Sequence, residues 1–288
     1  MQDFLKKHLE KRLTYMGSCD DFDASSKVIM GIPMDITTSF RSGTSLAPFR
    51  VREVSEGLEE YSLYQDKSLA DIDFYDVGDV LIPLGNLTAI LDKAEKVASR
   101  LLSQDKMLYT IGGEHLITLP LVKAYKAKYT DLVVVQMDAH ADLREEYLGE
   151  QLSHATVMHK VVGLIGQGNL YQLGIRSGTK EEISFAKHNT HLYLDQLKSP
   201  LEEVKGKIGS RPVYITLDID VLDPAFAPGT GTPEPAGFGT RELFETLLTL
   251  GELNVVGFDI VEISPPNELG DLTSILGAKI LREVLLRY

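Results

Sequence analysis

The sequence of 288 residues has a single cysteine, Cys19, and no tryptophan. One cysteine cannot form an internal disulfide, which is typical of proteins from a reducing compartment. The sequence also lacks an apolar stretch long enough to cross a bilayer, and its charged, amphipathic N-terminus has no apolar region of the signal-peptide type. We therefore predict a cytoplasmic protein.

Basic residues are in the minority, because 29 Lys and Arg stand against 42 Asp and Glu, for a formal net charge of -13 at pH 7. This surplus of negative charge repels nucleic acids and anionic membranes, so we expect neither as a partner. The charge suits a small cationic ligand, although a surface that only keeps the protein soluble has the same composition.

Apolar segments of strand length alternate along the chain with segments of helical spacing. Strands separated by helices in this way form a parallel sheet that is covered on both faces. The Pro- and Gly-rich stretch 224–239 lies between strands of the same kind, so we interpret it as an ordered loop and predict a single α/β domain over residues 1–288. The predicted strands cover residues 28–32, 107–111, 132–137, 170–175, 213–217 and 255–260, and the predicted helices cover residues 87–102, 117–128, 240–249 and 273–286.

Residues with metal-binding or acid–base side chains follow four of these strands directly. In parallel sheets, ligands bind beyond the carboxyl ends of the strands, so these residues are candidates for one common site. In chain order they are His115, then Asp138, His140 and Asp142, then Asp218 and Asp220, and finally Glu262.

The spacing of the aspartates indicates a metal site. Asp138, His140 and Asp142 are two residues apart, so in an extended segment they point to the same side, and Asp218 and Asp220 repeat this pattern. Desolvated carboxylates this close together either take up protons or bind cations. Two divalent cations would balance the four aspartates, and two ions that share carboxylates lie roughly 3.5–4 Å apart and generate a bridging hydroxide near neutral pH.

The ligand types favour Mn²⁺ or a similar first-row ion, because carboxylates and imidazoles are present without a thiolate, whereas zinc sites use more His or Cys. Each motif alone also has an ordinary structural explanation. Asp-x-Asp is common in turns, and a single histidine such as His115 is often only packed in a core. The repetition of such residues at strand ends makes metal binding the better interpretation.

The motifs resemble those of the ureohydrolase family of arginases and agmatinases. They are similar above all to agmatinases and to agmatinase-like N1-aminopropylagmatine ureohydrolases. The matching segments run through most of the chain and are residues 41–44, 48–50, 112–115, 138–142, 218–224, 231–235 and 259–262. The chain also departs from the family pattern: Glu114 stands where the family usually has Asp, Leu116 where Ser is common, and Ala236 where it usually has Gly. Asn267 and Glu268 stand where the family often has Tyr and Asp.

The resemblance implies a three-layer α/β/α fold with a mainly parallel sheet of about eight strands, two Mn²⁺ ions per subunit and a homotrimer or homohexamer. It also implies hydrolysis of a guanidinium group to urea. In the implied ligand sets, Asp138 and Asp218 bridge the ions, His115 and Asp142 complete one set, and His140 and Asp220 complete the other. For the remaining roles, the resemblance implies that Glu262 binds the guanidinium and that His154 transfers protons, and Asp142 is expected to pass the proton of the hydroxide to the leaving amine.

The loop 143–151 lacks the pattern with which arginases bind the α-carboxylate and α-amine of arginine, and it carries Glu145, Glu146 and Glu150. These glutamates suit a cationic substrate tail, although a solvated face has the same composition. We therefore predict a substrate with an amine tail, agmatine, which would give putrescine and urea in polyamine biosynthesis. One alternative substrate is N1-aminopropylagmatine, which would give spermidine. Guanidinobutyrate and formiminoglutamate are others, because Arg144 could bind the carboxylate at the tail of such a substrate. A one-zinc deacylase and an inactive polyamine-binding homologue are more distant alternatives.

Overall fold

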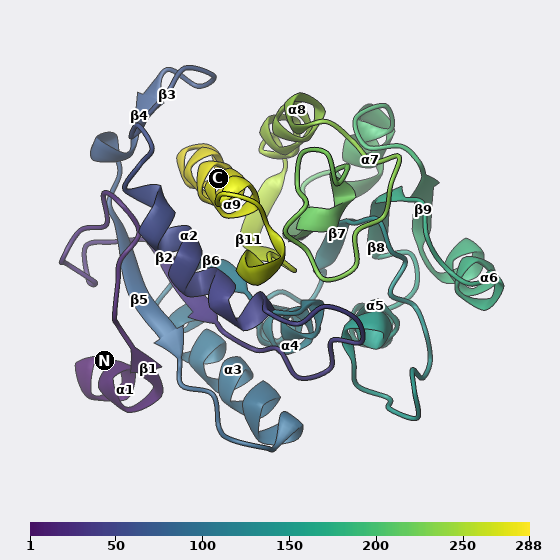
Figure 1. Cartoon of the computed structure of the whole chain (residues 1–288), viewed down its shortest axis with the longest axis horizontal. Helices are drawn as coiled ribbons and strands as arrows, with labels where there is room; N and C mark the ends of the chain where they lie inside the picture. Colours follow the sequence, from purple (N-terminus) through teal and green to yellow (C-terminus); the bar gives the residue numbers. More distant parts are fainter.

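The computed structural model describes residues 1–288, except for the side chain of Gln2. Its centre is a nine-stranded sheet with the order β1-β5-β2-β6-β11-β10-β7-β8-β9 (Figure 1). Eight of these strands are parallel, and only the two-residue edge strand β1 runs antiparallel, beside β5. The strands are β1 (Leu9–Glu10), β2 (Lys27–Ile32), β5 (Phe74–Val80), β6 (Met107–Gly112), β7 (Val133–Met137), β8 (Leu170–Ile175), β9 (His191–Leu194), β10 (Pro212–Asp218) and β11 (Asn254–Val261).

Helices cover both faces of the sheet, which gives the three layers visible in Figure 1. One face is covered by α2 (Ala47–Ser55), α7 (Leu201–Ile208), α8 (Thr240–Leu250) and α9 (Leu272–Arg287). The other face is covered by α3 (Leu87–Leu102), α4 (Thr118–Lys128), α5 (Val157–Ile165) and α6 (Lys180–Asn189). The α1 helix (Gln2–His8) precedes the sheet, and a separate small hairpin joins β3 (Tyr61–Ser62) to β4 (Lys67–Ser68).

The alternation of side chains along each strand builds two apolar cores. In β7, Val133 and Val135 belong to the core under α7, α8 and α9, whereas Val134 belongs to the core under α3, α4 and α5. A strand that is buried on both faces is apolar throughout, which is why the sequence pattern identified the central strands. The predicted α/β fold with a mainly parallel sheet is confirmed, and the expected count of about eight strands becomes nine with the short β1.

Three strands of the sheet, β1, β5 and β9, were not predicted. Strand β1 has only two residues, and the other two have distinct physical reasons. In β5, the fully buried Asp76 interrupts the apolar pattern, and the buried Arg52 of α2 donates hydrogen bonds to its carboxylate at 2.7 and 3.0 Å. A paired charge in a core position looks like a loop residue in the sequence. The other strand, β9, is a four-residue edge strand without a fully buried residue.

Glycine at position 113 brings the end of β6 into close contact with the loop after β2. A Cβ atom at Gly113 would lie 1.9 Å from the carbonyl oxygen of Met34, a distance that no side chain tolerates. This close approach allows the backbone N–H of Glu114 to donate to the carbonyl oxygen of Met34 at 2.8 Å. The backbone N–H of Glu262 donates to the carbonyl oxygen of Gly113 at 2.9 Å. The ends of β2, β6 and β11 are thereby joined beside the candidate site.

The loop 224–239 is held by hydrogen bonds near both of its ends, as expected for an ordered loop. The carboxylate of Asp223 accepts hydrogen bonds from the backbone N–H groups of Ala225 and Gly237, and this lowers the pKa of Asp223. Ala236 lies in this loop with a φ of 63°, in the left-handed region that favours glycine. The usual glycine of the family at this position therefore has a backbone reason, and alanine introduces strain here.

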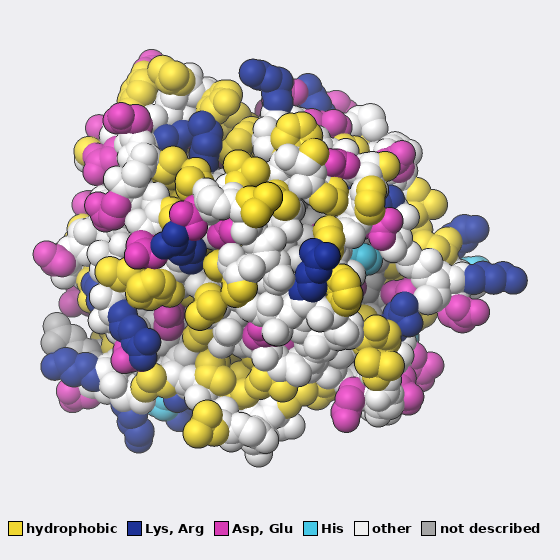
Figure 2. All heavy atoms as spheres, viewed as in Figure 1, with side chains coloured by type: hydrophobic (Ala, Val, Ile, Leu, Met, Phe, Trp, Pro, Cys, Tyr) yellow, Lys and Arg dark blue, Asp and Glu magenta, His cyan; other side chains and the backbone are white. Residues whose placement is uncertain are grey.

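No helix in the described part of the chain is long and apolar enough to cross a membrane. On the face drawn in Figure 2, Lys and Arg side chains are interspersed with Asp and Glu side chains and with apolar ones. The charges on this face are therefore mixed, despite the net charge of -13 for the whole chain.

Candidate metal centre

Four strands that are neighbours in the sheet, β6, β11, β10 and β7, carry the candidate residues at their carboxyl ends. The short 3-10 helix η3 (His115–Ile117) follows β6, and η5 (Ile219–Val221) follows β10. Because parallel strands end at the same edge of a sheet, side chains from distant parts of the sequence meet here. The predicted residues that meet at this edge are His115, Asp138, His140, Asp142, Asp218, Asp220 and Glu262.

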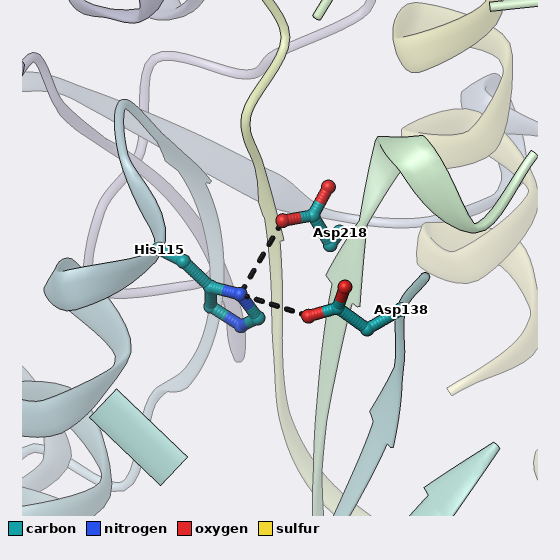
Figure 3. Close-up of side chains that lie close together, drawn as sticks. All are labelled: His115, Asp138 and Asp218. Atoms are coloured by element: carbon teal, nitrogen blue, oxygen red, sulfur yellow. Dashed lines mark ion pairs between the residues drawn. The ribbon is translucent and has the colours of Figure 1, made fainter. Parts of the chain in front are cut away.

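His115 is surrounded by carboxylates. Its Nδ1 atom lies 3.1 Å from an oxygen of Asp138, 3.1 Å from an oxygen of Asp142 and 3.3 Å from an oxygen of Asp218. Figure 3 shows Asp138 and Asp218 pointing at this nitrogen from two strands. His115, Asp138 and Asp218 form a group that could hold a metal ion.

A second group shares Asp138. The Nδ1 atom of His140 lies 2.8 Å from an oxygen of Asp220 and 3.8 Å from the other oxygen of Asp138. These three residues could also hold an ion. The two groups adjoin because Asp138 directs one oxygen to each.

The backbone that produces this convergence differs from the predicted extended segment. Strand β7 ends at Met137, and Asp142 adopts the left-handed conformation with a φ of 53°. Asp220 lies in the 3-10 helix η5 rather than in an extended continuation of β10. The side chains meet through turns that each carboxylate helps to form: Asp138 accepts from the backbone N–H of His140 at 2.6 Å, and Asp218 accepts from that of Asp220 at 2.9 Å.

Burial and mutual repulsion together disfavour the charged forms of the aspartates in the cluster. Burial, together with the charges of Asp220 and Asp142, raises the pKa of Asp138 to about 7. Burial lowers the pKa of His140, but the charge and hydrogen bond of Asp220 outweigh burial and raise that pKa to about 11. Without cations, the cluster therefore retains protons that solvent-exposed groups would release, and cations and protons compete for the same oxygens.

The geometry at His115 favours a cation. Its Nδ1 atom is buried and has no properly aligned hydrogen-bond partner, although three carboxylate oxygens lie within 3.3 Å. One N–H group cannot satisfy three acceptors, whereas a cation accepts a nitrogen and several oxygens at once.

A hydrogen-bond chain behind His115 determines which of its nitrogens faces the carboxylates. The hydroxyl of Thr216 donates to the buried Asp259 at 2.6 Å, so it can only accept from the Nε2 atom of His115, 3.0 Å away. Nε2 therefore carries the hydrogen, and Nδ1 keeps the lone pair that a metal requires. Tyr214 and Thr118 also donate to Asp259, at 2.6 and 2.9 Å.

The sequence pattern did not predict this supporting layer. One signal was available for Asp259, a charged residue within the apolar run of β11. Gln136 gave a similar signal in β7, and its side chain donates to the carboxylate of Asp138 at 2.7 Å. No spacing rule identifies Thr216, because a threonine in a strand is ordinary.

Comparison with known proteins identifies the family. A model of the arginase family matches residues 25–287. An agmatinase from Bacillus cereus is 48% identical over 277 residues, which cover 95% of this chain and 96% of that protein. A guanidinobutyrase from Pseudomonas aeruginosa is 35% identical over 286 residues, covering 95% and 90%. The crystal structure of the agmatine ureohydrolase of Thermoplasma volcanium has a TM-score of 0.87 at 32% identity, covering 99% of this chain and 97% of that one.

The chain belongs to the arginase family. The resemblance to ureohydrolases that its motifs carry is thereby confirmed.

In this arginase-family chain, Glu262 lies beside the two groups and is held in a strained conformation. Its φ is 64°, and its Oε1 atom accepts the backbone N–H of His115 at 2.6 Å. Burial raises the pKa of Glu262 well above its ordinary value. A buried carboxylate with this pKa and few partners gains from a cationic ligand.

The arginase-family site opens into a pocket of about 260 Å³. His154 lines the pocket from the 3-10 helix η4 (His154–Thr156), and its ring packs edge-on against Tyr147. Other lining residues are Ser39, His140, Asp142, Arg144, Thr179, Glu182, Asp218, Asp220 and Glu262. The structure thus places His154 and Glu262 in the pocket that contains the carboxylate cluster.

The loop 143–151 presents its acidic side chains to solvent. Glu145, Glu146 and Glu150 are exposed and lie outside the pocket lining. The loop instead contributes Arg144 and Tyr147, and the Arg144 guanidinium lies over the Tyr147 ring. The three glutamates therefore form a solvent-exposed face of the loop and do not line the pocket.

The raised pKa of Asp138 predicts a pH dependence of stability for the metal-free protein. The folded state keeps the Asp138 proton up to about pH 7, whereas the unfolded chain releases it near 3.8. The folded state therefore binds more protons between these values, and the free energy of unfolding falls as pH rises through this window. We expect Asp138→Asn to be more stable than the parent protein above about pH 7 in EDTA, by at most about 4 kcal/mol, and to be of similar stability near pH 4.

Urea denaturation in EDTA from about pH 4 to about pH 8 measures this difference. Asp131→Asn is the matched control, because Asp131 is exposed and precedes the same strand β7. Curves for Asp138→Asn and the parent protein that stay parallel over the whole range would contradict the prediction.

Proposed function

We propose that this chain is an agmatinase, which hydrolyses the guanidinium group of agmatine to give putrescine and urea. The observation that supports it most directly is the meeting of two imidazoles and four buried carboxylates beside Glu262, in a chain that is 48% identical to an agmatinase. A guanidinium is resonance-stabilised and a poor electrophile, so its hydrolysis needs a strong nucleophile in a fixed position.

We assign two Mn²⁺ ions to the cluster. His115, Asp138, Asp142 and Asp218 would hold one ion, and Asp138, His140, Asp218 and Asp220 would hold the other. When bound, the two ions would supply a hydroxide at neutral pH, which is the strong nucleophile that the guanidinium carbon requires. Two dications would also displace the protons that burial and repulsion keep on these aspartates.

Glu262 orients the substrate in this proposal. Its carboxylate accepts hydrogen bonds from two guanidinium N–H groups and fixes the plane of the guanidinium against the cluster. Gly231 leaves room for this, because a Cβ atom there would lie 3.7 Å from the Oε2 atom of Glu262 and 3.0 Å from the carbonyl oxygen of Arg41.

Asp142 and His154 move protons. Breakage of the bond between the guanidinium carbon and the alkyl nitrogen requires a proton on that nitrogen, and the carboxylate of Asp142, next to His115, is placed to pass it on. His154 at the pocket wall exchanges protons with bulk water, so that the site returns to its starting state.

Guanidinobutyrate hydrolysis is the second candidate, because Arg144 lines the pocket and could bind a carboxylate tail. Against this, the Nε atom of Arg144 lies 3.7 Å from the buried carboxylate of Glu182, which already balances its charge. An amine tail has its own acceptors in the same wall, including the hydroxyl of Thr179. Cytoplasmic location and a trimeric or hexameric assembly stay predictions.

Urea release from the Mn²⁺-loaded protein tests the proposal, with agmatine, N1-aminopropylagmatine, guanidinobutyrate and arginine assayed in parallel. We expect the highest kcat/KM with agmatine. A preference for N1-aminopropylagmatine or guanidinobutyrate would keep the chemistry and change the substrate, and release from none of the four would refute the function.

A further inference from the structure

Glu114 is a buried carboxylate between the metal cluster and the pocket wall. Its side chain has no exposed surface, and it receives three hydrogen bonds from the loop after β2. The backbone N–H groups of Ile36 and Thr37 donate to its Oε2 atom at 2.6 and 2.7 Å. The hydroxyl of Thr37 donates to its Oε1 atom at 2.7 Å.

The bond to Glu114 determines how Thr37 interacts with His154. The hydroxyl of Thr37 has one hydrogen, and that hydrogen points to Glu114, so toward all other partners the oxygen only accepts. It accepts the backbone N–H of His154 at 3.0 Å, and the Nδ1 atom of the same residue lies 3.4 Å away. A contact between Nδ1 and this oxygen therefore requires the hydrogen to be on Nδ1.

The surroundings of the other ring nitrogen agree with this assignment. The Nε2 atom of His154 lies 3.4 Å from the hydroxyl of Ser39. That hydroxyl accepts from Tyr147 at 3.3 Å, so its own hydrogen is free to point at a lone pair on Nε2.

We propose that Glu114, acting through Thr37, holds His154 in the tautomer with hydrogen on Nδ1 and a lone pair on Nε2. Glu114 is then a positioning residue for His154, in addition to its place in the motif that precedes the ligand His115. The lone pair on Nε2 is what a neutral histidine needs to accept a proton on its Ser39 side.

His115 shows that the same type of chain sets the opposite tautomer. There the buried Asp259 takes the hydrogen of Thr216, which accepts from Nε2 and leaves the lone pair on Nδ1. The site thus contains two carboxylate–threonine–histidine chains, in which the threonine meets Nε2 of His115 at 3.0 Å and Nδ1 of His154 at 3.4 Å. In both, a buried carboxylate determines the direction of every hydrogen bond along the chain.

The isosteric substitution Glu114→Gln reverses the direction of the hydrogen bonds from residue 114 to His154 without changing the shape of the side chain. Ile36 and Thr37 still donate backbone N–H groups, so the amide oxygen must take the position of Oε2. The amide nitrogen then occupies the position of Oε1 and donates to the hydroxyl of Thr37. That hydroxyl turns its hydrogen to Nδ1 of His154, and the ring moves its own hydrogen to Nε2.

Nitrogen NMR of the full-length chain labelled in its histidines tests the proposal directly, with Mg²⁺ added because it is diamagnetic. The chain has only 7 histidines, and the spectrum of His154→Gln identifies the signals of His154 by their loss. We expect the protonated-nitrogen signal of neutral His154 at Nδ1 in the parent protein and in Thr37→Ser. We expect it at Nε2 in Glu114→Gln and in Thr37→Val, which lacks the accepting hydroxyl.

Hydrogen on Nε2 in the parent protein, or on Nδ1 in either folded variant, Glu114→Gln or Thr37→Val, would overturn the proposal. Because two different substitutions test the same chain, failure of one variant to fold leaves the other decisive. The tautomer is read without substrate, so this result does not depend on the reaction.

The consequence for catalysis rests on the proposed function. With agmatine, we expect the kcat of Glu114→Gln to be about ten- to a hundredfold lower, with little change in KM. This is a fraction of the about 10²–10⁴-fold that a general acid–base group contributes to the rate. Glu114→Asp keeps the acceptor and should retain more activity. If the tautomer changes as expected and kcat does not, the role of His154 in proton transfer is wrong, while the control of its tautomer by Glu114 stands.

Discussion

Asp138→Asn is expected to lower urea release from agmatine by at least about 10³-fold, equivalent to about 4 kcal/mol of transition-state stabilisation. Asp138 directs one oxygen to His115 and the other toward His140, so it is the carboxylate common to both candidate metal groups. Asparagine has nearly the same shape but offers one neutral oxygen in place of two that share a charge. We therefore expect both ions to bind weakly, so that the nucleophile they would supply is lost.

Metal content per subunit, measured after gel filtration, and urea release at saturating Mn²⁺ separate binding from chemistry. We expect Asp138→Asn to retain less than one ion, whereas the control Asp131→Asn should behave like the parent protein. Asp131 and Asp138 flank the same strand, and only Asp138 lies at its carboxyl end. Full metal content together with activity within about tenfold of the parent would rule out a bridging role for Asp138.

Glu262→Gln is expected to have the second-largest effect, a decrease of about 10²–10⁴-fold in kcat/KM with metal content unchanged. Removing one partner of a buried ion pair costs about 3–5 kcal/mol, and the guanidinium of the substrate would be the partner left without its counter-charge. The glutamine keeps an oxygen that can accept the backbone N–H of His115, so the local fold should persist. Because burial raises the pKa of Glu262 in the free protein, the neutral variant should be at least as stable as the parent.

The pairing of lost activity with retained stability and metal content distinguishes a substrate-binding role from a structural one. Glu252→Gln is the matched control, because Glu252 is exposed, precedes strand β11 and forms only a surface ion pair with Lys205. If Glu262→Gln lost its metal ions or unfolded at lower urea concentration, Glu262 would be part of the framework rather than the residue that holds the guanidinium.

The predictability of the central fold follows from burial. Strands such as β7 and β10 lie in the middle of the sheet with both faces covered, so their sequences are mostly apolar, with Gln136 and Thr216 as exceptions. The first aspartates, Asp138 and Asp218, mark the ends of these runs. Strand β5 does not obey this rule, because its core position 76 is a charge paired with Arg52. Such a pair can be recognised only when both partners are seen together.

The loop 143–151 shows a second limit. The acidic composition of this loop favoured a substrate with an amine tail but left open whether its glutamates contact the substrate. In the structure the side chains of Glu145 and Glu146 are exposed, and Arg144 and Tyr147 line the pocket. A loop without hydrophobic periodicity gives no indication of which side chains point inward. The identity of the tail that the pocket accepts therefore depends on geometry that composition does not contain.

By itself, the sequence determined which chemical groups are available and that they follow strands: aspartates and histidines at i and i+2 after apolar runs, with Glu262 at the end of another. Those facts are local, because strand ends and side-chain types can be read within a few residues. Only the tertiary structure decided that β6, β11, β10 and β7 are neighbours, that Asp138 is common to two groups, and which nitrogen of His115 faces the carboxylates. The tautomer of a histidine depends on hydrogen bonds between residues that are far apart in the sequence, such as His115 with Thr216. Thr37 and Glu114 are a second such pair. A local sequence pattern cannot show which distant residues meet in the fold.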